Sequence, residues 1–181
     1  MLRAALALAA GAMLLALTAC GAPGEDALDE LREDMTAADG VTVRAAVTST
    51  AGGEYAEYEL ECTRSGGEYG VTVLAPAEVA GVTATLDLDG GTLGYDGLAL
   101  AFASPGGVTP ITALPELLRA LESAYAALSW TEGESSFVSL EVTDSLTMTV
   151  ELGGDGSPVW AELLEDGAAS AQCEISQFTI D

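Results

Sequence analysis

The chain has no histidine and no lysine, and cysteine occurs only three times. Histidine is the commonest general base near neutral pH and the commonest metal ligand, and lysine is a frequent covalent nucleophile. The Gly-x-Ser-x-Gly nucleophile elbow is absent as well. No nucleophile and base can be paired from these residues, so an envelope hydrolase is poorly supported. We expect a protein that is not an enzyme and that holds no metal or cofactor.

Positive charge is also scarce, because five arginines stand against 29 aspartate and glutamate residues and leave a net charge of −24. Such a surface cannot neutralise phosphates, which argues against nucleic acid as a partner. It also repels anionic headgroups, so a basic patch cannot supply membrane attachment. The acidity is typical of a solubility device. Attraction of cationic partners or loosely held divalent ions is the alternative.

The one long apolar run, from Ala4 to Thr18, is shorter than the about 20 residues that span a membrane. It follows Arg3 and ends in Leu17-Thr18-Ala19-Cys20, which resembles a bacterial lipobox. The resemblance implies a signal peptide over residues 1–19 and a diacylglycerol on Cys20. The protein would then be anchored by lipid to the extracytoplasmic face of a membrane in the cell envelope. The alternative is an ordinary signal or anchor with an incidental cysteine.

Acylation of Cys20 would leave Cys62 and Cys173 as the remaining thiols. Two cysteines in an exported domain indicate a disulfide, and two buried unpaired thiols are the alternative. Residues 20–26 form the lipidated N-terminus and a short tether. Residues 27–181 are long enough for a single domain with its own core.

Hydrophobic periodicity predicts a helix over residues 25–36 and then strands from Val41 onwards, where apolar and polar residues alternate. A second helix, with apolar residues at helical spacing from Leu114 to Leu128, is predicted over residues 115–129. A bulge is expected near Ser176-Gln177, where the apolar parity of the last strand changes. The remaining strands are expected at residues 56–62, 69–75, 82–89, 91–95, 98–103, 135–143, 145–152, 158–165 and 170–180.

This order predicts the α+β class: a strongly curved antiparallel sheet of about ten strands, an unclosed half-barrel, with both helices covering its concave face. Two acidic motifs add no chemistry to it. Glu57, Glu59 and Glu61 share one strand face and are expected to be a solvated stripe. Asp87-Leu88-Asp89-Gly90-Gly91 fails the spacing of a calcium loop and is expected to be a hairpin turn.

The chain resembles the LolA-like family in the order of its features. A lipobox is followed by a meander that contains Val73-Leu74-Ala75-Pro76, Gly81 and Asp89-Gly90-Gly91, and then by a helix and a final meander. That family includes the LolA and LolB lipoprotein carriers and the LppX and LprG lipoproteins. The resemblance implies a helical lid over an apolar cavity that takes acyl chains. LolA carriers also use an arginine on the barrel interior, whereas the parity of Arg44 places it outside.

We therefore expect a lipid or other hydrophobic small molecule as ligand, the membrane as attachment site, and another envelope protein as a candidate partner. The alternative function is a lipid-tethered sensor or protein-interaction domain with a filled core. The strand and helix residues expected to line the cavity are Val43, Tyr58, Val71, Leu86, Leu117, Leu118, Leu121, Tyr125, Leu140 and Met148.

Overall fold

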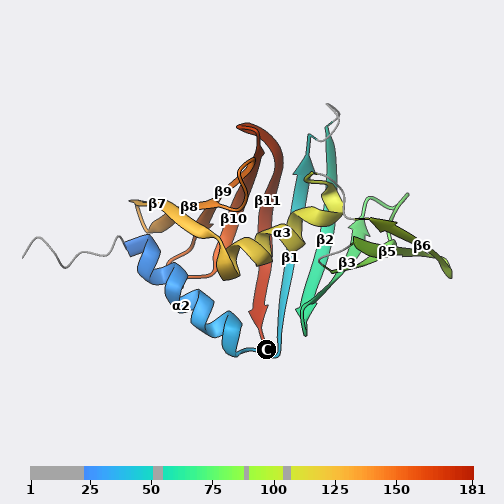
Figure 1. Ribbon diagram of the computed structural model, residues 1–181, viewed down its shortest axis with the longest axis horizontal. Helices are drawn as coiled ribbons and strands as arrows, with labels where there is room; N and C mark the ends of the chain where they lie inside the picture. Colours follow the sequence, from blue (N-terminus) through green and yellow to red (C-terminus); the bar gives the residue numbers. More distant parts are fainter. Residues whose placement is uncertain (1–22, 51–54, 88–89, 104–106) are drawn as a thin grey trace, which may run out of the picture.

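The structure, a computed structural model, describes residues 23–50, 55–87, 90–103 and 107–181. Within these ranges, eleven strands form one antiparallel sheet, and two helices lie across one of its faces (Figure 1). The elements are α2 (Pro23–Ala37), β1 (Gly40–Ser49), β2 (Ala56–Ser65), β3 (Glu68–Ala75), β4 (Thr83–Leu86), β5 (Gly90–Tyr95), β6 (Leu98–Ala103), α3 (Pro110–Ser123), β7 (Tyr125–Glu132), β8 (Ser135–Glu141), β9 (Leu146–Leu152), β10 (Pro158–Glu165) and β11 (Ala168–Ile180).

The sheet consists of two meanders joined at the centre. Its strand order is β6-β5-β4-β3-β2-β1-β11-β10-β9-β8-β7, so β1 pairs with β11, and β6 and β7 are the two free edges. Helix α3 carries the chain from one edge to the other across the concave face. The predicted curved and unclosed half-barrel is therefore confirmed, with one strand more than expected.

Helix α2 agrees closely with its predicted position. Pro23 begins it, and Glu25 and Asp26 stand in its first turn, where acidic side chains complement the helix dipole. Leu28, Leu31 and Met35 are buried in the core, as their helical spacing predicts. The helix packs on β7 and β8, so it covers the C-terminal meander.

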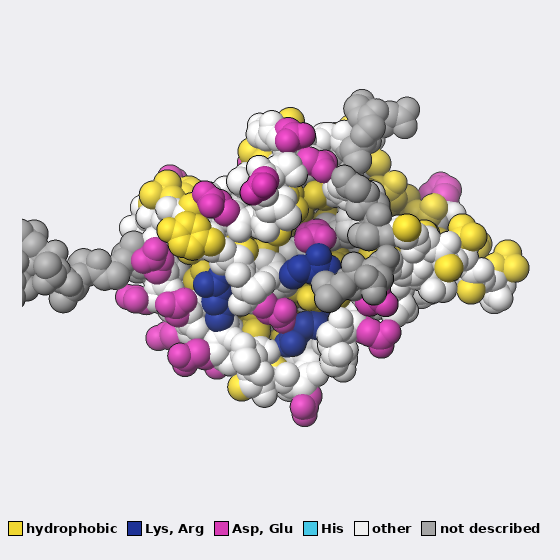
Figure 2. Space-filling model, in the orientation of Figure 1, with side chains coloured by type: hydrophobic (Ala, Val, Ile, Leu, Met, Phe, Trp, Pro, Cys, Tyr) yellow, Lys and Arg dark blue, Asp and Glu magenta, His cyan; other side chains and the backbone are white. Residues whose placement is uncertain are grey.

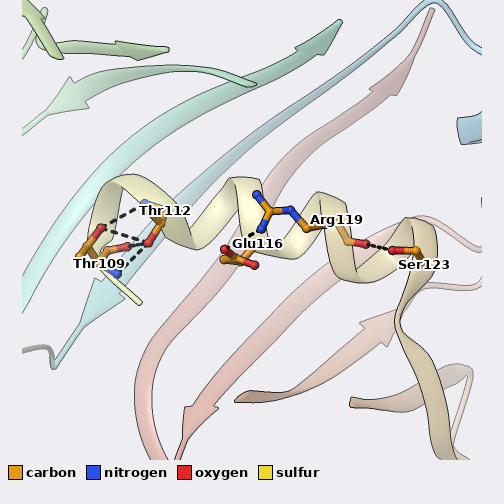
Figure 3. A network of polar contacts seen from close by, with 5 residues as sticks. All are labelled: Thr109, Thr112, Glu116, Arg119 and Ser123. Atoms are coloured by element: carbon orange, nitrogen blue, oxygen red, sulfur yellow. Dashed lines mark hydrogen bonds and ion pairs between the residues drawn. The ribbon is translucent and has the colours of Figure 1, made fainter. Parts of the chain in front are cut away.

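Helix α3 begins five residues earlier than predicted, at Pro110 instead of Pro115. Its start is fixed by a capping box, because the Thr109 hydroxyl accepts a hydrogen bond from the Thr112 amide and the Thr112 hydroxyl accepts one from the Thr109 amide (Figure 3). Pro110 suits the first helical position, since a helix leaves that N–H without a partner. Pro115 lies inside the helix instead of at its start.

The predicted end of α3 is wrong. The helix stops at Ser123, Ala124 is extended with φ −71° and ψ 150°, and the next residues form β7. The helical spacing of Tyr125 and Leu128 after Leu121 therefore misleads. Both side chains are exposed, at 69% and 61%, in an edge strand that pairs with β8.

The expected bulge in the last strand is confirmed. The register between β1 and β11 shifts between Arg44, opposite Gln177, and Ala45, opposite Ile175, so Ser176 has no partner residue on β1. The Ser176 hydroxyl donates a hydrogen bond of 3.2 Å to the Arg44 carbonyl. The bulge reverses the parity of β11 and keeps apolar residues on the concave face at both of its ends.

Candidate functional site

The predicted lid residues form a closed core. Leu117, Leu118 and Leu121 of α3 are fully buried, and α3 packs against β1, β2, β3 and β11. The strand residues expected to line a cavity beneath the helix are equally enclosed, none more than 5% exposed: Val43, Val71, Leu86, Leu140 and Met148. The structure therefore brings these eight positions together as packed core, as the alternative function expected.

The other two predicted cavity residues lie elsewhere. Tyr125 is wrong as a cavity residue, because β7 carries it at the sheet edge, where it is exposed. Tyr58 of β2 is half-buried beside the N-terminal end of α3 and lines an apolar cavity there. Sequence periodicity placed Tyr58 on the correct face without showing that the helix leaves this part of the face open.

That opening is a groove at the end of the sheet formed by β3 to β6. An inner cavity of about 190 Å³ is lined by Tyr58, Leu60, Val73, Val79, Val82, Leu93, Pro110 and Ile111. An outer cavity of about 350 Å³ shares Val79, Val82 and Leu93 with it and is completed by Glu78, Gly94, Tyr95, Leu98, Ala99 and Leu100. We call the two together the apolar groove.

The local structure of the groove follows from the chain on either side of it. Strand β3 ends at Ala75, and the Gly81 amide returns to donate a hydrogen bond of 2.9 Å to the Val73 carbonyl. Gly81 has φ +87°, a conformation that favours glycine, and the return places Val79 and Val82 beside β3. The start of α3 closes the opposite wall with Pro110 and Ile111.

The groove ends in an unusually apolar surface. Leu98 and Leu100 of the edge strand β6 are 76% and 68% exposed, which is high for large aliphatic side chains. Residues 90–115 contain one charged residue, Asp96, in a chain with 29 acidic residues. Figure 2 shows hydrophobic side chains reaching the surface at the end that holds β5 and β6. This run with a single charged residue is the sequence signal that could have located the site.

Arginine side chains fasten both helices to the fold. Neither helix has a basic residue in its last turn, and arginines from other elements take that place. Arg32 of α2 donates to the Leu121 carbonyl at 2.8 Å and to the Ala124 carbonyl, at the C-terminal end of α3. Arg64 of β2 donates to the Met35 carbonyl of α2 at 2.7 Å. Carbonyls that a helix end leaves unpaired are thereby satisfied.

Arg64 lies on the concave face, unlike Arg44, whose predicted outward position is confirmed by its ion pair with Glu59 on the outer face. Arg64 Nε stands 2.9 Å from Glu122 Oε1 of α3, with side chains 15% and 25% exposed. Burial raises the pKa of Glu122, and the charges of Arg64 and Arg119 oppose that rise. The interior arginine is therefore engaged by both helices and is not free for a ligand.

We expect Arg64→Met to lower the free energy of unfolding by about 3 kcal/mol, because it leaves the Glu122 carboxylate buried without its partner. Without Arg64, the pKa of Glu122 would lie still further above its ordinary value. The Glu122 carboxylate of the folded variant then binds a proton more tightly than that of the unfolded variant, so protonation stabilises the folded state. The loss should therefore shrink as the pH falls from 7 toward 5. Urea unfolding at both pH values measures it.

The matched control is Arg44→Met, which breaks an exposed strand pair and should cost less than about 1 kcal/mol. Adding Glu122→Gln to Arg64→Met should recover a large part of the loss, because the amide carries no charge. Equal costs for the two arginine variants would contradict the role assigned to Arg64.

A third cavity, of about 250 Å³, lies on another flank of α3 and is polar. Glu116 and Arg119 of α3 form an ion pair of 3.1 Å there (Figure 3), and Glu165 and Thr143 line the wall. The Arg119 guanidinium also stacks over the Tyr69 ring at 5.7 Å. The contact between Arg119 and Tyr69 fastens α3 to β3.

The two thiols of the described domain are both buried and unpaired, so the predicted disulfide is wrong. Cys62 stands opposite Val43 of β1. Cys173 stands opposite Val47, on the other side of the same strand. The two cysteines are therefore two strand spacings apart across the sheet and four residues apart along it, which puts their Cα atoms about 16 Å apart. A disulfide needs Cα atoms under about 7 Å apart. Burial raises the pKa of both thiols to about 12.

The acidic motifs show turn and surface geometry. The Asp87 carboxylate accepts a hydrogen bond of 3.0 Å from the Gly90 amide, which closes the hairpin between β4 and β5. Glu59 faces Arg44 on the outer side of the sheet. Within the described ranges, no group of three or more acidic, cysteine or histidine side chains is placed to hold a metal ion. Cys20 lies outside the described residues.

No protein-family model matches the sequence, and no curated protein does. Solved structures match over most of the chain. An uncharacterized conserved protein from Thermus thermophilus is 12% identical with a TM-score of 0.50, over 87% of this chain and 86% of that one. A LolA superfamily protein from Nitrosomonas europaea is 9% identical with a TM-score of 0.45, over 89% and 94%. The Mycobacterium tuberculosis lipoprotein LppX is 13% identical with a TM-score of 0.40, over 87% and 99%.

At these identities the likeness concerns the fold alone. The chain shares its fold, a curved antiparallel sheet with helices across one face, with the Thermus thermophilus protein. Helices α2 and α3 are not long and apolar enough to cross a membrane.

Proposed function

We propose that the protein is a lipid-anchored protein of the cell envelope that binds an acyl chain or a similar hydrophobic molecule in the apolar groove. The observation that carries the proposal is the groove itself, because its outer cavity of about 350 Å³ lies within the size range of small-molecule sites, roughly 300–1,000 Å³. Its walls are aliphatic and aromatic, and Glu78 at the rim is the one charged residue among the described residues that line it. The role is binding and not catalysis.

The groove differs from the cavity expected beneath a helical lid. The ligand would enter along β4 to β6, beside the N-terminal end of α3, and α3 would stay in place. The buried leucines of α3 and the arginine contacts at the helix ends support a fixed helix. A ligand lying along Leu98 and Leu100 would also cover side chains that water now reaches.

We expect Leu93→Glu to weaken binding of a fluorescent long-chain fatty acid at least tenfold, because Leu93 borders both parts of the groove. A carboxylate there would have to lose its hydration when the acyl chain enters. Thr92→Glu is the matched control. Thr92 is the adjacent residue of β5, is exposed and faces the other side of the sheet, so its affinity should stay within twofold.

Fluorescence titration gives the two affinities, and native mass spectrometry of protein purified from a lipid-containing host identifies bound ligand. Equal affinities of the two variants would contradict binding in the groove. A ligand-free wild type that also fails to bind the fatty acid would favour the second candidate function.

That second candidate is a lipid-tethered sensor or protein-interaction domain. The packed core beneath α3 favours it, since Leu117, Leu118 and Leu121 are fully buried in one hydrophobic cluster with the strand residues that face them. In that case Leu98 and Leu100 on the free edge β6 would contact a protein instead of an acyl chain.

A further inference from the structure

The N-terminal end of α2 is held against the edge of the sheet. A Cβ atom built on Gly24 would lie 3.1 Å from Ser129 Cβ of β7 and 3.2 Å from the Phe137 carbonyl oxygen of β8. A side chain at this position would push the neighbouring strand atoms away by a few tenths of an ångström. Cys20 precedes Gly24 by four residues, so the Cα atoms of the two residues are at most about 15 Å apart, since a residue spans at most about 3.6 Å.

An aromatic pair stands at the same place on the sheet. Trp130 follows Ser129 in β7, and it stands opposite Phe137 of the neighbouring strand β8. The two rings stack with centroids 5.3 Å apart and an angle of 10° between their planes. Successive residues of a strand face opposite sides, so the pair lies on the outer face, and Leu128 beside it is 61% exposed. We call Leu128, Trp130 and Phe137 the aromatic edge.

Tryptophan and other aromatic side chains favour the boundary between acyl chains and headgroups, because an apolar ring and a polar N–H suit both environments. The Trp130 indole N–H donates to Glu132 Oε1 at 3.2 Å, at the C-terminal end of β7. An anchor attached within about 15 Å holds this edge at the membrane surface, so even weak insertion would orient the whole domain.

We propose that the aromatic edge is the membrane-facing side of the anchored protein, and that it inserts into the headgroup region of an electrically neutral bilayer. The proposal rests on the anchoring at Cys20 put forward above. Glu132, Glu141 and Glu151 surround the edge, since Glu141 ends β8 and Glu151 pairs with Phe137, so anionic headgroups would be repelled. Zwitterionic lipid is therefore the surface that fits.

This orientation has a consequence for the apolar groove. Figure 1 places β5 and β6 at the end of the long axis opposite to the N-terminal end of α2. With the aromatic edge at the bilayer, the groove lies at the end of the domain opposite to the anchoring membrane. A ligand would then be exchanged with a second protein or a second surface.

The two tryptophans of the chain allow a direct test. Residues 20–181 keep every described element and can be coupled through Cys20 to a maleimide phospholipid in phosphatidylcholine vesicles. Cys62 and Cys173 are buried and do not compete. Brominated acyl chains in the vesicles quench the emission of a tryptophan that reaches the bilayer. Because the coupling is chemical, the result does not depend on acylation in the cell.

Trp160→Phe leaves Trp130 as the reporter, and Trp130→Phe leaves Trp160. Trp160 lies on β10, three strands from β7 and therefore about 14 Å away on the same face. We expect brominated lipid to remove at least half of the emission of the Trp130 reporter and less than a tenth of that of the Trp160 reporter. Replacing a third of the lipid with phosphatidylserine should reduce the quenching of Trp130 at low salt.

Absent quenching of Trp130, or equal quenching of both reporters, would overturn the proposal. The first result means that the edge stays in water and is open to a protein partner. The second means that the aromatic edge does not face the bilayer in preference to the rest of the outer face. Neither result touches anchoring at Cys20 or ligand binding in the groove, which the variants of those sites test separately.

Discussion

Leu121→Ala is expected to lower the free energy of unfolding by roughly 2–5 kcal/mol, whereas Leu128→Ala should change it by less than about 0.5 kcal/mol. The two leucines have the same chemistry and the same apparent helical spacing. Leu121 of α3 is fully buried between the helix and the sheet, while Leu128 of β7 is 61% exposed. Truncating Leu121 leaves a cavity among close-packed side chains, and truncating Leu128 removes atoms that already touch water.

Urea unfolding of the two variants beside the wild type measures the difference, and equal slopes against denaturant would show that both unfold in the same way. Leu128 serves as the control because it preserves the residue type. A loss under about 1 kcal/mol at Leu121 would indicate an incompletely filled space below α3. Such a result would support the helical lid over a cavity that the LolA-like resemblance implies.

Local periodicity predicted most of the fold. Alternation of apolar and polar residues located the strands, because a half-buried strand exposes every second side chain. It also located the β11 bulge, where the parity of Cys173 and Ile175 differs from that of Phe178 and Ile180. Helix α2 was recognised by its leucine spacing and its acidic first turn. These features depend on neighbouring residues, and they are legible in a single sequence.

The end of α3 was misjudged because two patterns overlap. Leu121, Tyr125 and Leu128 satisfy helical spacing, but Tyr125, Trp130 and Thr131 are residues that favour strands. Tertiary pairing with β8 decides between them, and a local pattern does not contain it. The capping residues Thr109 and Thr112 were the available signal for the true start.

The groove and the cysteines required knowledge of distant neighbours. Periodicity places Cys62 and Cys173 on one sheet face, but their separation depends on the register of two different strands with β1. Periodicity likewise assigns Val82 and Leu93 to an apolar face without telling which part of it α3 covers. The helix packs over β1, β2, β3 and β11, and this leaves the far end of the face open.

Charge distribution connects the groove with the aromatic edge. The chain carries net charge −24, yet residues 90–115 at the groove hold one charge. The aromatic edge is apolar as well, but Glu132 and Glu151 border it. A neutral end suits a hydrophobic ligand or partner, while an aromatic edge with an acidic rim suits neutral headgroups and depends on an anchor to hold it there.

Cys20→Ser is expected to abolish membrane retention. With two acyl chains, each buried methylene contributes about 0.8 kcal/mol, which holds a protein on a bilayer where the acidic surface alone would be repelled. Serine has no thiol to accept the diacylglycerol, so the variant should appear in the soluble fraction or accumulate as precursor with residues 1–19 still attached. Fractionation and the mass of the N-terminal peptide distinguish these forms.

Cys62→Ser and Cys173→Ser are the matched controls, since both thiols are buried and neither can be reached by an acyl-transfer enzyme in the folded chain. Both variants should stay in the membrane fraction if they fold, and their own unfolding curves show whether they do. A Cys20→Ser protein that is processed and still retained in the membrane would contradict lipid anchoring. In that event the aromatic edge becomes the remaining candidate for attachment, because its Trp130 and Phe137 would then have to hold the domain without an acyl chain.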